Sequence, residues 1–359
     1  LSPDFRRHAM FPIMYGLFAC HDREKFTVTG YQLNPKSDNF TTEIRNAADE
    51  WCDISAVTHE EAAKKIRADG VDILVELASH AKNSGLPILA YRPARVHISG
   101  LGSLCSTGMK EVDYYITDEV VDPPGMHDAF FTEKPLYLPA QFGYTGRNDV
   151  PVPVGTPCKE KGFILFGVIQ IYSKITDEML LAWKKILESL PTAQLLVKSV
   201  SFGGNSLTIA AYERLQNLGL PMERIILEAG DNEYMQRLLD VDILLETYPY
   251  TGGSTSLDAL YMGVPVVTRY GERRNTRFCY SILKSIGLEE LAAQDVPSYI
   301  DTALNLAGDV ELLDLLHKNI RRMMTDNQIM SPQGYTKNLE QAYLKMAAEY
   351  KMFAEGNNT

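Results

Sequence analysis

The segment VDILLETYPYTGGSTSLDALYMGVPVVTRYG, residues 241–271, contains a strand, a polar loop and a helix in succession. Ile243–Leu245 is an apolar run of the kind found in strands that are buried on both faces. Apolar residues then recur at three- and four-residue spacing, at Leu257, Leu260, Tyr261 and Val264. That spacing predicts an amphipathic helix. A strand that leads through a short loop into a helix is the repeating unit of a parallel α/β sheet.

The loop between that strand and that helix contains Gly252 and Gly253, followed by Ser254 and Thr255. Glycines let a ligand approach the backbone, and the first turn of a helix offers unpaired N–H groups and the positive end of its dipole. These features predict a diphosphate site that needs no Walker lysine. A capping box, with Thr255 as N-cap and Asp258 reaching back to it, explains the same residues without a ligand. The segment is compatible with both.

The composition is ordinary for a globular protein, with 359 residues, of which 45% are hydrophobic and 23% charged. The length predicts two domains. A net charge of −11 argues against nucleic acid as a partner, and no apolar run reaches membrane-spanning length. Five scattered cysteines, none in a CxxC pair, argue against zinc and disulfides and favour a reducing, cytoplasmic location. Leu1-Ser2 resembles the end of a strand, so we expect an upstream segment.

The sequence contains one internal echo, VDILVE at residues 71–76 and VDILLE at 241–246. Each copy follows a helical pattern and leads into a small polar loop. Strands and helices that alternate in both halves predict two facing Rossmann-like, doubly wound sheets with a cleft between them. The expected parts are a first domain at 1–145, a linker at 146–160, a second domain at 161–335, and a C-terminal helix at 336–359 packing back toward the first half.

Local signals place further elements along the chain. A capping box at Thr58 predicts a helix that extends to Ala68, and Thr176 is the expected N-cap of a long amphipathic helix. Phe163–Ile169 and Pro87–Tyr91 are predicted strands.

Lys174 follows the first of these strands through a loop that also contains Gln170, and it precedes the helix start at Thr176. A lysine near a helix N-terminus is disfavoured by the dipole unless an anion lies there too. The carboxyl ends of parallel strands lie at one edge of the sheet, where ligands bind. We therefore predict that Lys174 and the loop Gly252–Thr255 bind one diphosphate, with a surface lysine as the alternative.

Two histidines are candidates for a general base. His8 lies in a loop after the first, incomplete strand, beside Asp4, Arg6 and Arg7. There it would face the cleft and accept a proton, unless it is a loop histidine bonded to a backbone carbonyl. His80 follows another strand at the same edge and is the second candidate.

Other catalytic signatures are weak or missing. Asp240-Val241-Asp242 matches the D-x-D metal pattern, but it precedes its strand, at the edge away from the ligands. We interpret these as surface aspartates and infer no metal. No G-x-S-x-G, H-E-x-x-H, Walker A or G-x-G-x-x-G pattern occurs, so hydrolase, zincin, kinase and dinucleotide functions have no support.

Several motifs together resemble one protein family. They are SPDFRRH (2–8), YRPARVHISGLG (91–102), DYYITD (113–118), FGVIQIYSKIT (166–176), ETYPYTGGSTSLDALYMGVPVVTRYGE (246–272) and the following Arg277. In this order they resemble the catalytic region of the SPINDLY and O-GlcNAc transferase family. The resemblance implies an α/β GT-B fold, metal-independent inverting transfer of a sugar to a protein hydroxyl, no cofactor beyond the nucleotide-sugar donor, and tetratricopeptide repeats upstream.

The resemblance also implies roles for the predicted residues. His8 takes the place of the active-site histidine proposed as base, and Lys174 that of the lysine that holds the diphosphate. Ser254 and Thr255 stand where hydroxyls and N–H groups meet the phosphates, and Asp258 stands where a carboxylate binds the ribose.

The nucleobase pocket is expected around three further positions. Ala229 and Arg237 match positions beside the base, and Tyr234 stands where members often have a stacking histidine. Ser103-Leu104-Cys105, Ile169-Gln170-Ile171 and Gly253 also depart from patterns of the family near the donor sugar. The expected donor is UDP-GlcNAc and the expected acceptor a protein or peptide. The alternatives are a protein N-glucosyltransferase, another nucleotide-sugar enzyme such as an epimerase, and a non-catalytic nucleotide-sugar-binding relic.

Overall fold

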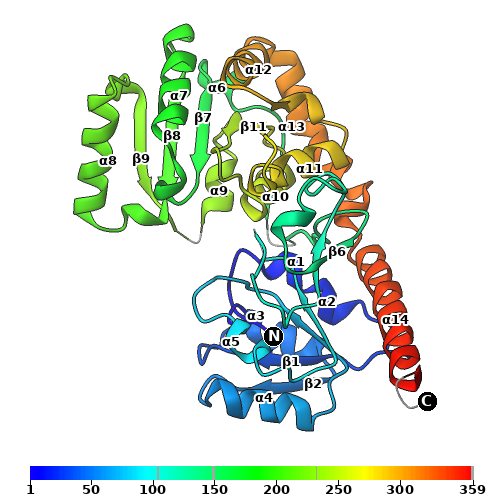
Figure 1. The fold of residues 1–359 in the computed structure, drawn as a ribbon. Coiled ribbons are helices and arrows are strands. Elements are labelled where there is room, and N and C mark those ends of the chain that lie inside the picture. The colour runs from blue at the N-terminus through cyan, green and yellow to red at the C-terminus, as the bar shows by residue number, and fades with distance from the viewer. Residues whose placement is uncertain (103–104, 148–149, 232, 357–359) are drawn as a thin grey trace. The chain divides into compact units, whose positions relative to one another are not determined.

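The computed structural model describes residues 1–102, 105–147, 150–231 and 233–356 of the chain. By their internal contacts, the residues form two compact units. The first comprises Leu1–Thr145 with Gln328–Thr359, and the second comprises Gly146–Asn327. Both units contain strands connected by helices (Figure 1).

The second unit is built on a six-stranded parallel sheet with the order β12-β11-β10-β7-β8-β9. Its strands are β7 (Leu165–Ile169), β8 (Gln194–Ser199), β9 (Ile225–Ala229), β10 (Ile243–Leu245), β11 (Val266–Arg269) and β12 (Ala292–Ala293). The chain runs outward from β7 to β9 and then returns to β10 on the other side of β7. The boundary between β7 and β10 is therefore a topological switch point, and ligands of such sheets bind beyond the carboxyl ends of the strands there.

Helices connect these strands and cover the sheet. They are α6 (Cys158–Lys161), α7 (Asp177–Ser189), α8 (Asn205–Asn217), α9 (Tyr234–Leu238), α10 (Ser254–Tyr261), α11 (Phe278–Ser285), α12 (Val296–Gly308) and α13 (Val310–Thr325). The buried face of α7 contains Trp183, whose indole N–H donates to the Tyr299 hydroxyl of α12 at 3.1 Å. That hydroxyl donates in turn to the backbone carbonyl of Glu246 at 3.1 Å. Two helices are thus fixed to the carboxyl end of β10.

The first unit contains a four-stranded parallel sheet, β3-β4-β5-β6, and a parallel pair, β1-β2. The strands are β1 (Thr29–Gln32), β2 (Glu50–Asp53), β3 (Ile73–Glu76), β4 (Val96–Ser99), β5 (Tyr114–Thr117) and β6 (Lys134–Tyr137). The helices are α1 (Phe11–Met14), α2 (Gly16–Ala19), α3 (Asn39–Ala47), α4 (His59–Ala68), α5 (Leu86–Leu89) and α14 (Pro332–Gly356).

Leu1 and Ser2 lie between β1 and β3. Ser2 forms a parallel bridge with Gln32 of β1, and the Leu1 carbonyl accepts the N–H of Leu77, just after β3, at 3.1 Å. The chain proceeds from Ser2 to β1 and β2 on one side and resumes with β3 on the other. A second switch point therefore lies here, and the loops that end in His8 and His80 follow it.

The core of the first unit forms from the apolar faces of its strands and helices. Its buried members are Leu1, Tyr31, Ile54, Ala62, Ala63, Ile66, Leu74, Ile88, Leu89, Ala94 and Val112. Burying one leucine or isoleucine side chain stabilises a fold by about 1.5–3 kcal/mol, so this cluster holds β1, β3, α4 and α5 together. Among the described residues, no helix is both long and apolar enough to cross a membrane.

The predicted helix starts at Thr58 and Thr176 are confirmed. Thr58 forms a capping box with Glu61, and Thr176 accepts the N–H of Met179 at 3.4 Å. The predicted strand Pro87–Tyr91 is wrong, because Leu86–Leu89 forms helix α5. Its proline lies in the first turn, where no backbone N–H is needed.

Candidate functional site

Lys174 lies beyond the carboxyl end of β7, at the switch point of the second unit. Its ammonium donates to Oε1 of Gln170 at 3.2 Å and lies 4.7 Å from the centre of the Tyr250 ring. Within the described part of the chain, that is its one hydrogen bond, although an ammonium has three donors. The side chain is half-buried, and burial lowers the pKa of Lys174 while the Glu246 carboxylate opposes that effect. An anion that accepted the unused donors would restore the solvation that burial removes.

The loop after β10 leads into the first turn of α10. The helix begins at Ser254, and its N-cap residue is Gly253. A glycine has no side chain that could accept an N–H group of the first turn. The first backbone bond runs from the N–H of Leu257 to the Gly253 carbonyl at 3.0 Å. The N–H groups of Ser254 and Thr255 precede this bond and point out of the helix end. The alternative capping box at Thr255 and Asp258 is wrong.

Gly252 brings this loop against the loop that contains Lys174. A Cβ atom at Gly252 would lie 2.7 Å from Nε2 of Gln170 and 2.6 Å from Oε2 of Glu246. Only a residue without a side chain permits so close an approach. Gln170, Lys174 and the loop Gly252–Thr255 therefore lie around one spot at the edge of the sheet.

Asp258 and Tyr234 lie next to each other on α10 and α9. The Tyr234 hydroxyl donates to Oδ2 of Asp258, and burial together with this carboxylate raises the pKa of Tyr234. Arg147 donates to Oδ1 of Asp258 at 3.4 Å and to the Tyr234 hydroxyl at 3.4 Å. Asp258 is fully buried, so its charge is compensated by these partners and not by bulk water.

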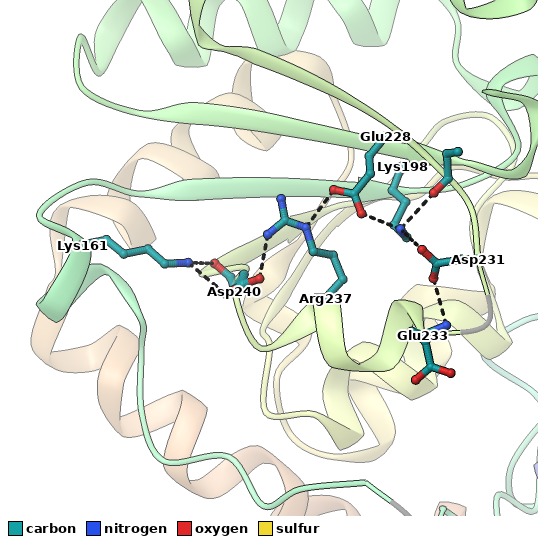
Figure 2. Close-up of polar contacts among 8 residues, drawn as sticks. Lys161, Lys198, Glu228, Asp231, Glu233, Arg237 and Asp240 are labelled. Carbon is teal, nitrogen blue, oxygen red and sulfur yellow. Dashed lines mark hydrogen bonds and ion pairs between the residues drawn. The ribbon is translucent and has the colours of Figure 1, made fainter. Parts of the chain in front are cut away.

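Arg237 belongs to a chain of alternating charges, shown in Figure 2, and Ala229 is joined to that chain by its backbone carbonyl. The ammonium of Lys198, 1% exposed, donates to Glu228 at 2.5 Å, to the Ala229 carbonyl at 2.9 Å and to Asp231 at 2.8 Å. Arg237 donates to the other oxygen of Glu228 at 2.9 Å. This arrangement fixes the end of β9, where Ala229 is exposed, relative to α9.

The two candidate bases, His8 and His80, belong to the first unit. Nδ1 of His8 accepts the N–H of Met10 at 3.3 Å, and Nε2 lies 3.7 Å from Oδ1 of Asp4. Burial lowers the pKa of His8, an effect opposed by Asp4 and assisted by Arg6. His80 is exposed, and its Nε2 pairs with the backbone carbonyl of Ser106 at 3.0 Å.

The D-x-D aspartates are not both on the surface, which corrects the prediction for Asp242. Asp242 is fully buried and accepts hydrogen bonds from the Thr156 hydroxyl and from the N–H groups of Cys158 and Leu165. Asp240 pairs with Arg237 at 2.6 Å and with Lys161 at 3.3 Å. Among the described residues, no group of three or more His, Cys, Asp or Glu side chains is arranged to hold a metal ion.

Sequence reasoning missed Glu246, Ser256 and Arg147 as parts of the site. Glu246 ends the echo VDILLE, directly after a buried strand. This position at the carboxyl end of a strand could have identified Glu246 as a residue near the site. Arg147 lies in the predicted linker, and nothing local shows that its side chain pairs with Asp258. The departures at Ser103-Leu104 lie outside the described residues.

Curated relatives align with nearly the whole chain. A protein of Petunia hybrida named "Probable UDP-N-acetylglucosamine--peptide N-acetylglucosaminyltransferase SPINDLY" is 32% identical over 98% of this chain and 38% of its own length. An Arabidopsis thaliana protein of the same enzyme name, SEC, is 29% identical over 96% of this chain and 36% of its own. The chain thus spans well under half the length of these relatives.

Solved structures share the fold. A mutant of the Thermobaculum terrenum O-GlcNAc transferase matches with a TM-score of 0.92 and 33% identity, covering 98% of this chain and 68% of that one. Anabaena HepE in complex with UDP matches with a TM-score of 0.58 and 9% identity, covering 97% and 98%. The predicted α/β, GT-B fold class is confirmed. The profile of "Glycosyl transferase family 41" matches residues 1–149 and 158–339, and the chain belongs to this family.

Proposed function

We propose that this chain is the catalytic part of a metal-independent, inverting glycosyltransferase that moves GlcNAc from UDP-GlcNAc to a serine or threonine hydroxyl of a protein. The half-buried Lys174 ammonium carries the proposal, because in the described chain it uses one donor and leaves two. The first turn of α10 adds N–H groups and the positive end of a dipole beside it. The enzyme names of the relatives describe the same reaction in those proteins.

In the proposed reaction, the acceptor oxygen attacks the anomeric carbon and the bond from that carbon to the β-phosphate oxygen breaks. The hydroxyl proton passes to a base, and the diphosphate leaves with added negative charge. Lys174 and the first-turn groups of Ser254 and Thr255 stabilise that charge. A well-placed donor contributes about 3 kcal/mol in comparable oxyanion sites. Because Lys174 and the helix supply the positive charge, the proposal needs no metal ion.

The nucleoside contacts follow from the family resemblance and are supported by the clustering of the residues. Asp258 is assigned to the ribose, and Tyr234, its hydrogen-bond partner, to the face of the nucleobase. Ala229 and Arg237 are assigned to the edge of the base. Both belong to the charge network of Lys198, which keeps them in fixed positions.

His8 is the proposed base. Burial lowers the pKa of its imidazole, so the ring is neutral near pH 7, as a proton acceptor must be. The bond from the Met10 N–H to Nδ1 places the ring proton on Nε2. His8 accepts a further proton on Nδ1 only when this long contact opens, and a water chain is the alternative route.

His8→Ala separates these two routes. If His8 is the base, kcat falls by about 10²–10⁴-fold. UDP affinity stays unchanged, because the proposal assigns the diphosphate to the second unit. Single-turnover transfer and calorimetric titration with UDP measure the two quantities. An unchanged kcat would assign the proton to the water chain.

Thermal unfolding with nucleotide sugars tests the function itself. UDP-GlcNAc at 100 times its Kd should stabilise the protein by about 2.7 kcal/mol and raise Tm. UMP, which lacks the β-phosphate, is the matched control and should act far more weakly. Protein or peptide acceptors should then gain GlcNAc. Transfer of no sugar, with no rise in Tm for any nucleotide sugar, would contradict the proposal.

We propose the cellular location and the kind of partner from the composition of the chain. The cytoplasmic location stays a prediction from the cysteine pattern. The net charge of −11 is the reason why nucleic acid has no place in the proposal.

A further inference from the structure

Glu246 is a buried carboxylate, 1% exposed, directly after β10 at the switch point. Its Oε1 accepts from Nε2 of Gln170 at 3.0 Å and from the N–H of Thr247 at 2.9 Å. Its Oε2 accepts from the hydroxyl of Ser256, in the first turn of α10, at 2.6 Å. One side chain thus joins the loop after β7, the end of β10 and the start of α10.

The carboxylate decides which way the Gln170 amide points. A carboxylate only accepts hydrogen bonds, so the NH₂ end of the amide must face Glu246. The carbonyl end then faces Lys174, whose ammonium only donates, at 3.2 Å. If the amide turned over, its NH₂ group would meet the ammonium, donor against donor. By fixing the Gln170 amide in this orientation, Glu246 ensures that the amide oxygen accepts a hydrogen bond from the Lys174 ammonium.

The backbone of Gly252 lies close to the side chains of Glu246, Gln170 and Ser256. A Cβ there would lie 2.6 Å from Oε2 of Glu246 and 2.9 Å from the Ser256 hydroxyl. The loop that is proposed to meet the phosphates therefore rests directly on the carboxylate and its partners. Because the contacts are close, a shift of the Glu246 or Ser256 side chain should also shift the Gly252 backbone.

We propose that Glu246 is a positioning residue for the diphosphate: through Gln170 it aims the free donors of Lys174 at the ligand, and through Ser256 it fixes the first turn of α10. This inference rests on the proposed function. Glu246 has no role of its own in the chemistry, since its oxygens are taken by protein donors.

The charges around the cluster agree with this role. Burial lowers the pKa of Lys174, and Glu246 is the charged group that raises it again. In the described part of the chain, Glu246 also interacts with Cys279 and Tyr299. Burial raises the pKa of both groups, so both are neutral near pH 7. Removing the negative charge of Glu246 should therefore lower the pKa of Lys174 further. Lys174 would lose its proton, and its hold on an anion, at a lower pH.

Glu246→Gln tests the inference because it keeps the shape and removes the charge. In ligand-free protein labelled at the lysine Cε, NMR titration should show the Lys174 midpoint at a lower pH than in the wild type, because the charge that raises this pKa is gone. Calorimetry should show UDP binding about tenfold weaker above that midpoint. Glu76→Gln is the matched control, since Glu76 is an equally buried carboxylate in the echo VDILVE that accepts N–H groups in the first unit. It should change neither quantity.

Gln170→Met is the second variant, for the case that Glu246→Gln does not fold. It removes the amide that links Glu246 to Lys174 and leaves Glu246 bonded to Thr247 and Ser256. This variant should also weaken UDP binding. An unaltered Lys174 titration and UDP affinity in the folded variant would overturn the inference and leave the proposed function standing. A wild-type protein that binds no UDP would instead remove the proposed function.

Discussion

Lys174→Met is expected to abolish sugar transfer while the fold stays intact. The substitution removes the cation at the switch point but keeps an unbranched side chain of similar length. Loss of one such donor in a transition state costs about 10²–10³-fold in kcat, and loss of a full charge costs more. Initial rates with UDP-GlcNAc and a protein acceptor measure the effect, with circular dichroism as the check on folding.

Lys185→Met is the matched control for this substitution. Lys185 is an exposed lysine on α7 in the same unit, and its replacement should leave transfer unchanged. The wild-type enzyme should also lose UDP affinity as the pH rises through the lowered pKa of Lys174, because only the protonated ammonium attracts the diphosphate. Wild-type turnover by Lys174→Met would remove the central assignment of the site.

Gly252→Ala is expected to eliminate UDP binding and to destabilise the second unit. The added methyl group would meet three polar atoms closer than 3.0 Å, on Glu246, Gln170 and Ser256, and all three belong to one hydrogen-bond network. Overpacking of this kind typically costs about 1–3 kcal/mol. Chemical denaturation measures the stability, and calorimetry measures the affinity for UDP.

Gly308→Ala provides the comparison for Gly252→Ala. Gly308 ends α12, and a Cβ there would meet nothing within 4 Å. Alanine also has the higher helix propensity, so the stability should hold or rise slightly and UDP affinity should not change. Normal UDP binding by Gly252→Ala would show that the loop backbone does not contribute to the site as proposed.

The framework of the second unit could be predicted from local patterns. β7 and β10 are short apolar runs, and the start of α7 is marked by a capping threonine. These signals depend on neighbouring residues only, so they are readable without the fold. Lys174 and Gly252 could be placed at one edge because parallel strands share the direction of their carboxyl ends.

Two of the interpretations that failed concern aspartates whose partners lie far away in the chain. The capping box was the alternative considered for Asp258, but its carboxylate is bound by Tyr234 and Arg147 and does not cap its own helix. Asp242 was expected at the surface, yet the N–H of Cys158 and the Thr156 hydroxyl take it into the interior. No periodicity reveals such pairings, because each joins residues that are separated by more than twenty positions.

The open first turn of α10 has a consequence for turnover. A helix with a capping side chain satisfies the N–H groups of its own first turn. The N-cap of α10 is Gly253, which has no side chain, so these N–H groups are left to the solvent or a ligand. In the proposed reaction, donor and product present the same diphosphate to these groups and to Lys174. UDP should therefore be a strong product inhibitor, competitive with the donor, and its departure should limit the speed of successive cycles.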